Sequence, residues 1–189
     1  MQQPLILASA SPRRKQLLAA TGLAFSVQTA DTAEDYPDNL SILEIPQHIA
    51  FNKARAVAEI CAKEAVILAA DTIVAIEGQI LGKPRDAAQA AAYLELLSGK
   101  THQVVTGVCI YSHVKTRSFS VKTDVHFLAL SKAQISYYIE QYKPFDKAGA
   151  YGIQEWIGMI GIDEIHGDYY NVMGLPVSAV SQELTAFGF

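Results

Sequence analysis

Three cations at positions 13–15 stand at the start of a helical pattern, in the stretch SPRRKQ. Ser11 followed by Pro12 predicts a helix N-cap with proline at the first helical position. A helix N-terminus already carries about half a positive charge, so cations in its first turn lower helix stability. A bound anion would reverse that effect, because backbone N–H groups, the helix dipole and the guanidinium groups would all attract it. The pattern favours a site for a multiply charged anion, and the alternative is that these side chains extend into solvent.

Two further charged residues interrupt apolar patterns. Asp71 lies within the strand-like run AVILAADTIVAI at 65–76, and a carboxylate buried alone costs several kcal/mol unless it meets a metal, a cation or several donors. Lys53 falls on the apolar stripe of a predicted helix, so its ammonium must extend to water or find a buried anion. A strand-end Asp71 bonded to nearby backbone and a solvated Lys53 are the alternatives.

Two charged loops could add to such a site. Lys83 follows the EGQ turn at 77–79, and a tight hairpin there would bring it close to the ends of the Asp71 strand. The loop DTAEDYPD supplies separated carboxylates at Asp31, Glu34, Asp35 and Asp38. Cations for phosphate oxygens, carboxylates for a hard divalent ion and a candidate base together suit phosphate chemistry. Each loop is also consistent with an ordinary solvated surface.

Composition excludes several other classes of protein. The chain has 189 residues, 50% of them apolar, and a net charge of −4, which argues against a general nucleic-acid binder. Cys61 and Cys109 form no CxxC pair, so we expect neither a disulfide framework nor a zinc site. The five histidines lack the HExxH spacing of zinc proteases, and no serine stands in a GxSxG motif, so a hydrolase triad is poorly supported. No apolar run reaches the roughly 18 residues of a membrane span and no signal peptide is evident, so we expect a cytoplasmic protein.

Strand and helix patterns alternate along the chain, which predicts an α/β protein. Strands are predicted at LILAS, FSVQTA, 65–76, QVVTGVCIYS, RSFSVKTDVHFLA and WIGMIGIDEI, and helices at 12–21, 46–63, after Asp86, at 132–142 and at 176–187. Ser131 and Gln134 form a predicted capping box for the fourth helix. No linker or internal repeat is present, so we expect one mixed-sheet domain, residues 1–189, with at most two lobes.

Several stretches together resemble the Maf family of nucleoside triphosphate pyrophosphatases, which are distant relatives of the inosine triphosphate pyrophosphatases. They are LILASASPRRKQLL, NKARAVA at 52–58, AADTIV at 69–74, LGKPRDAAQAAAYLELLSGKTHQVVTGV at 81–108, DKAGAYGIQ at 146–154 and GLP at 174–176. They cover nearly the whole chain in the family's order. The resemblance implies a mixed twisted sheet flanked by helices, two-lobed with a central cleft, as in the inosine triphosphate pyrophosphatases.

The resemblance also implies an activity, the hydrolysis of a nucleoside triphosphate to the monophosphate and pyrophosphate with a divalent cation, Mg²⁺ or Mn²⁺. It implies that Asp71 is the proton acceptor and a possible metal ligand. Family positions that contact phosphate correspond to Ser9, Arg13, Lys53 and Lys83. At Arg13, Thr72 and Gln154 the sequence resembles the branch of the family that acts on dTTP and UTP.

One departure from the family pattern concerns the acidic residues after the second predicted strand. The family often has a compact Asp-Glu doublet, whereas this sequence has DTAED. We align Glu34 with the metal-associated position, and Asp31 or Asp35 are alternatives. Proteins of this family have been associated with septation, so a nucleotide-binding regulator with incidental hydrolysis is the alternative function. The resemblance is also compatible with a homodimer, with a nucleoside triphosphate as the expected partner and neither nucleic acid nor membrane.

Overall fold

The computed structural model describes residues 3–189, and its strands form one mixed sheet. The strands are β1 (Leu5–Leu7), β2 (Ser26–Val27), β3 (Val66–Ile76), β4 (Gln79–Leu81), β5 (Thr101–Tyr111), β6 (Thr116–Phe127) and β7 (Ile162–His166). Their order is β2-β1-β3-β5-β6-β7, with β4 paired to β3. β1 pairs in parallel with both β2 and β3, while β3–β4 and β6–β7 are antiparallel. The predicted mixed α/β sheet is therefore confirmed.

Seven α-helices and one short 3₁₀ helix occur among residues 3–189. They are α1 (Pro12–Ala19), α2 (Glu44–Ala58), α3 (Ala87–Leu97), α4 (Lys132–Tyr142), η1 (Ala148–Ala150), α5 (Trp156–Gly161), α6 (Tyr169–Met173) and α7 (Val177–Thr185). The chain divides into two compact units. Unit 1 comprises 1–71, 106–121 and 174–189, and unit 2 comprises 72–105 and 122–173.

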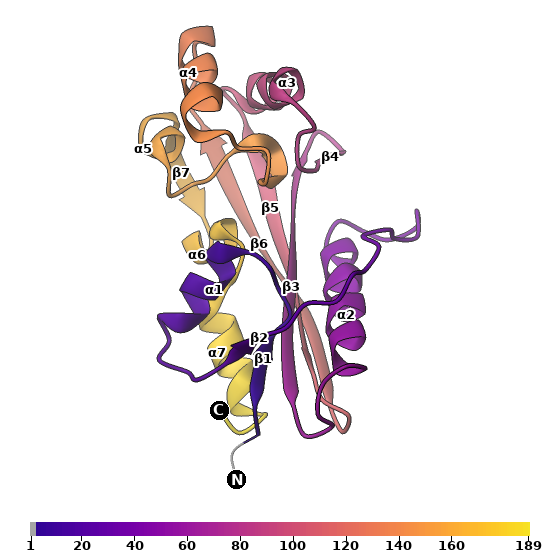
Figure 1. The fold of residues 1–189 in the computed structure, drawn as a ribbon. Helices are drawn as coiled ribbons and strands as arrows, with labels where there is room; N and C mark the ends of the chain where they lie inside the picture. The colour runs from indigo at the N-terminus through magenta and orange to yellow at the C-terminus, as the bar shows by residue number, and fades with distance from the viewer. Residues whose placement is uncertain (1–2) are drawn as a thin grey trace. The chain divides into compact units, whose positions relative to one another are not determined.

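In unit 1, helices cover both faces of the β1–β3 strands, with α2 on one side and α7 on the other (Figure 1). The α2 side is a core of small and branched apolar side chains that includes Ala50, Ala54 and Val57 against Ile67. A close backbone approach makes this packing possible. A Cβ built at Gly107 of β5 would lie 2.1 Å from the carbonyl carbon of Pro46, so only glycine lets α2 approach β5 this closely.

In unit 2, α3, α4, η1 and α5 pack around an apolar core supplied by strand residues of β3, β5 and β6. Phe127, Tyr138 and Leu94 are fully buried in this core. The core fixes the segment 146–155, because Ala150, Tyr151 and Ile153 are buried members of it. This segment carries one of the predicted site residues, Gln154.

One predicted element is wrong in its first half. The run WIGMIGIDEI, predicted as a strand, forms helix α5 over Trp156–Gly161 and becomes strand only at β7. A physical reason is the close contact at Gly158, where a Cβ would lie 1.9 Å from the Ile153 carbonyl oxygen. This local contact, which only glycine permits, holds the first turn of α5 against the preceding backbone despite the β preference of the isoleucine and tryptophan side chains.

Candidate active site

Helix α1 begins as the sequence predicts, with Ser11 as N-cap and Pro12 at the first helical position. The Ser11 hydroxyl accepts the N–H of Arg14 at 3.4 Å, and the Ser9 hydroxyl accepts the N–H of Ser11 at 3.2 Å. No acidic residue lies in the first turn. Two hydroxyls and the positive end of the helix dipole therefore lie together at the end of β1.

The three cations of this turn differ in their surroundings. Lys15 is exposed, whereas Arg13 and Arg14 are partly buried. Arg14 Nε donates to the Gly174 carbonyl at 2.8 Å, and Arg14 Nη1 lies 3.4 Å from Ser9 Oγ. Burial lowers the pKa of Arg14, and the negative charges of Asp71 and Glu34 act against that shift. Arg14 therefore interacts electrostatically with Asp71 and Glu34. The sequence prediction had assigned Arg13, and not Arg14, to the site.

Lys53 joins two carboxylates of unit 1. Its Nζ lies 2.6 Å from Glu34 Oε1 and 2.7 Å from Asp71 Oδ1. The Asp71 side chain is 13% exposed and that of Lys53 is 18% exposed, whereas that of Glu34 is 49% exposed. The sequence left a metal, a cation or several donors open for Asp71, and solvent or an anion open for Lys53. In the structure the two side chains contact each other.

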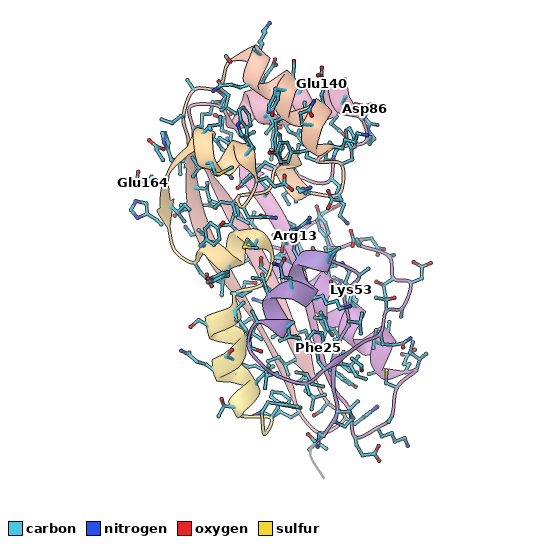
Figure 2. The ribbon with its side chains drawn as sticks, turned by 60° about the vertical axis from the view of Figure 1, so that its left-hand side comes forward. Arg13, Phe25, Lys53, Asp86, Glu140 and Glu164 are labelled. Atoms are coloured by element: carbon cyan, nitrogen blue, oxygen red, sulfur yellow. The ribbon has the colours of Figure 1, made fainter. Side chains whose placement is uncertain are left out.

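The elements explain how these three residues meet. Asp71 lies within β3, whose residues 66–71 are all buried. Lys53 lies on α2, one turn from the buried Ile49 and Val57, so its stem follows the apolar face of the helix. Glu34 comes from the loop between β2 and α2. Figure 2 shows Lys53 on α2 and Arg13 at the start of α1.

Thr72, Lys83 and Gln154 belong to unit 2. Thr72 is partly buried, while Lys83 and Gln154 are exposed. Their elements are linked through Gly149, whose N–H donates to the Gly82 carbonyl at 3.2 Å. Gly149 has a φ of +69° and packs so closely on Val74 that an added Cβ would lie 3.0 Å from both of its methyl groups. Unit 2 thus ties the loop of Gln154 to the turn of Lys83 and to β3.

A buried charge network in unit 2 was missed by the sequence interpretation. Lys147 Nζ lies 2.8 Å from Asp146 Oδ1 and 3.2 Å from Glu155 Oε1. The Tyr138 hydroxyl donates to Glu155 Oε2. The one sequence signal for it was a lysine placed among small and apolar residues in KAGAYGI.

A known family model matches the chain over nearly its whole length. The family model described as "Maf-like protein" matches residues 4–187, which include residues of both units. The chain belongs to the Maf family.

Named relatives of this Maf-family chain are close in sequence. It is 51% identical over 181 residues to the dTTP/UTP pyrophosphatase of Phocaeicola vulgatus, covering 95% of this chain and 94% of that one. It is 49% identical over 187 residues to the dTTP/UTP pyrophosphatase of Porphyromonas gingivalis, covering 97% and 94%. Among solved structures, the Staphylococcus aureus Ham1 protein aligns with a TM-score of 0.44 and 16% identity over 66% of this chain and 71% of that chain.

No group of three or more His, Cys, Asp or Glu side chains that could hold a metal ion occurs among residues 3–189. Cys61 and Cys109 are free, and burial raises the pKa of Cys109 to about 11, so its thiol stays protonated near neutral pH. In the part of the chain that the structure describes, no helix is long and apolar enough to cross a membrane.

Proposed function

We propose that this Maf-family chain hydrolyses dTTP and UTP to the nucleoside monophosphate and pyrophosphate. The observation that carries the proposal is the Lys53 ammonium held between Glu34 and Asp71, 2.6 and 2.7 Å from their oxygens. Such a set provides a cation for phosphate oxygens and a carboxylate for activating water. The names of relatives about half identical over nearly the whole chain support the same substrates.

We also propose that the reaction requires a divalent cation, Mg²⁺ or Mn²⁺, held by Glu34 and Asp71. These two carboxylates already share one cation, the Lys53 ammonium, so their oxygens face a common point. Mg²⁺ commonly binds through one or two carboxylates together with substrate phosphates and water, so a two-carboxylate set fits it. When bound, the ion would polarise a phosphoryl oxygen and lower the pKa of a bound water.

The protein's own groups have separate roles in this proposal. Asp71 orients the attacking water or accepts its proton. Lys53 and Arg13 balance the charge of the phosphates, and the Ser9 hydroxyl and the N–H groups at the start of α1 donate hydrogen bonds to them. Lys83 is assigned a phosphate contact because the family resemblance implies one. Pyrophosphate leaves as a stabilised anion.

Base selection is assigned to Gln154, together with Thr72 and Arg13. The exposed Gln154 amide offers a donor and an acceptor, which match the O4 and N3–H edge of uracil or thymine. A site built to form hydrogen bonds rejects a mismatched base more strongly than an apolar site, because its polar groups are left unpaired. Cytosine presents the opposite donor and acceptor pattern at these positions.

The experiment that tests the proposal is pyrophosphate release from a panel of dTTP, UTP, CTP and GTP, with and without Mg²⁺. We expect rapid, metal-dependent release of pyrophosphate from dTTP and UTP. Nucleotide binding without turnover would instead favour a nucleotide-binding regulator of septation, and release of orthophosphate would indicate a general phosphatase. Cytoplasmic location and a homodimeric state remain predictions.

A further inference from the structure

The base selectivity of the proposed site depends on how the segment that carries Gln154 is held in place. Gln154 is exposed, yet it lies between the buried Ile153 and the partly buried Glu155. An exposed amide on a short loop can discriminate between bases only if the backbone beneath it is held in one conformation. The contacts below Gln154 therefore bear on specificity as well as on stability.

The first contact that holds this segment is the buried ion pair of Lys147. The Lys147 side chain is 8% exposed, and its Nζ lies 3.2 Å from Glu155 Oε1. The pair connects the two ends of the segment 147–155, one at the residue before η1 and one at the residue before α5. A second carboxylate, Asp146, lies 2.8 Å from the same Nζ at the exposed side of the pair.

The second contact is the Tyr138 hydroxyl, which is fully buried on α4. It donates to Glu155 Oε2 and accepts the N–H of Gly152 at 3.0 Å. One hydroxyl thus fixes both the Glu155 carboxylate and the backbone two residues before Gln154. Burial and the Glu155 charge raise the pKa of Tyr138, so the hydroxyl keeps its proton and remains the donor.

The third contact is steric. A Cβ built at Gly152 would lie 2.9 Å from Glu155 Cδ and 3.2 Å from Lys147 Cε, so the Gly152 backbone rests directly on the ion pair. The Glu155 N–H also donates to the Gly152 carbonyl at 3.0 Å. These two contacts close a turn over 152–155 that includes Gln154.

We propose that Glu155, with Lys147 and Tyr138, positions the Gln154 amide and thereby sets the selectivity of the site for uracil and thymine over cytosine and guanine. The inference rests on the proposed function. Glu155, Lys147 and Tyr138 act as positioning residues, since their polar atoms are engaged with one another and with the backbone. Replacing one of them leaves Gln154 present and loosens its backbone.

The test measures kcat and KM for UTP, dTTP, CTP and GTP in two variants, each with a matched control. Tyr138→Phe removes the bridging hydroxyl, and its control is Tyr142→Phe on the same helix, whose ring stacks on Tyr138 at 5.0 Å. Glu155→Gln removes the carboxylate charge, and its control is Glu140→Gln, an exposed position on α4 (Figure 2). Circular dichroism and melting temperature establish that each variant is folded.

We expect the ratio of kcat/KM for UTP over CTP to fall about tenfold or more in Tyr138→Phe and Glu155→Gln, mainly through a higher KM for UTP. Both controls should keep the wild-type ratio. A ratio within twofold of wild type in folded Tyr138→Phe, or an equal loss for all four substrates, would overturn the positioning role. Wild-type protein that cleaves none of the four triphosphates would refute the proposed function itself, and this inference with it.

Discussion

Lys53 and Asp71 form an ion pair between α2 and β3, with 2.7 Å between Nζ and Oδ1. The same Nζ lies 2.6 Å from Glu34 Oε1, so one cation holds two carboxylates. The Lys53–Asp71 pair is mostly buried, and a buried ion pair is costly to keep for stability alone. In the proposed reaction it serves two purposes, because Lys53 is available to phosphate and the carboxylates to a metal ion and water.

Asp71→Asn should reduce the rate of pyrophosphate release by at least about 10³-fold, because the amide can neither accept the proton of water nor hold a divalent cation as well as a carboxylate. The substitution keeps the size of the side chain, and Lys53 keeps Glu34 as a partner. The melting temperature should therefore stay close to that of the wild type. Near-normal turnover of UTP or dTTP in this variant would exclude the role given to Asp71.

Lys53→Met removes the ammonium charge and keeps an unbranched side chain that can pack as the lysine stem does. Without the cation, the Glu34 and Asp71 carboxylates repel each other, so the metal-free variant should melt at a lower temperature than the wild type. Mn²⁺ should raise its melting temperature more than that of the wild type, because the ion then replaces the missing positive charge. Lys63→Met, at an exposed position beyond the end of α2, is the matched control. An equal response to Mn²⁺ in both variants would argue against a metal site at these carboxylates.

Sequence patterns that depend only on neighbouring residues predicted much of the fold. The cap at Ser11, the capping box of Ser131 and Gln134 and the hairpin at 77–79 depend on neighbouring residues, and all three are confirmed. Helix α5 was missed because its start depends on Gly158 packing against the Ile153 backbone, a contact that residue preferences do not show. The partnership of Asp71 and Lys53 was partly predictable, because each charge interrupted an apolar pattern.

Side-chain direction was beyond sequence reasoning. Arg13 and Arg14 are adjacent cations with the same chemistry, and only the structure shows that Arg14 bonds to Gly174, far away in the chain. The network of Lys147, Glu155 and Tyr138 was missed for a similar reason. Its members come from α4 and from two ends of a loop, and the loop motif alone does not show that Lys147 and Tyr138 meet at Glu155.

Gln154→Glu tests the residue assigned to base selection. A carboxylate accepts hydrogen bonds and donates none, so it should lose the bond to O4 of uracil and thymine while accepting from the amino group of cytosine. We expect kcat/KM for UTP and dTTP to fall by about 10²-fold and the preference over CTP to shrink or reverse. The measurement is the same four-substrate panel, and an unchanged preference would contradict the assignment. Gln141→Glu, at an exposed position on α4, is the matched control.

His102 should make the stability of the protein depend on pH. Its ring is 1% exposed, stacks on Phe127 at 5.6 Å between centroids and lies 2.6 Å from the Tyr151 hydroxyl through Nε2. Among the described residues, Nδ1 has no hydrogen-bond partner. Burial lowers the pKa of His102 from 6.5 to about 4, and outweighs the opposite effect of the Asp124 charge. A charged ring is therefore strongly disfavoured in this core.

The sign of the effect follows from proton binding. As the pH falls from 6.5 towards 4, His102 takes up a proton in the unfolded chain and stays neutral in the folded one. The unfolded state then binds more protons, so the free energy of unfolding decreases over this window, by about 3 kcal/mol in total. Urea unfolding at pH 7 and pH 4.5 measures it. His102→Gln, which keeps a polar group near Tyr151, should lose about 2 kcal/mol less stability between these two pH values than the wild type. His113→Gln, at an exposed position, should behave like the wild type. An equal loss in all three proteins would mean that His102 titrates normally and that the imidazole reaches water, contrary to its buried position.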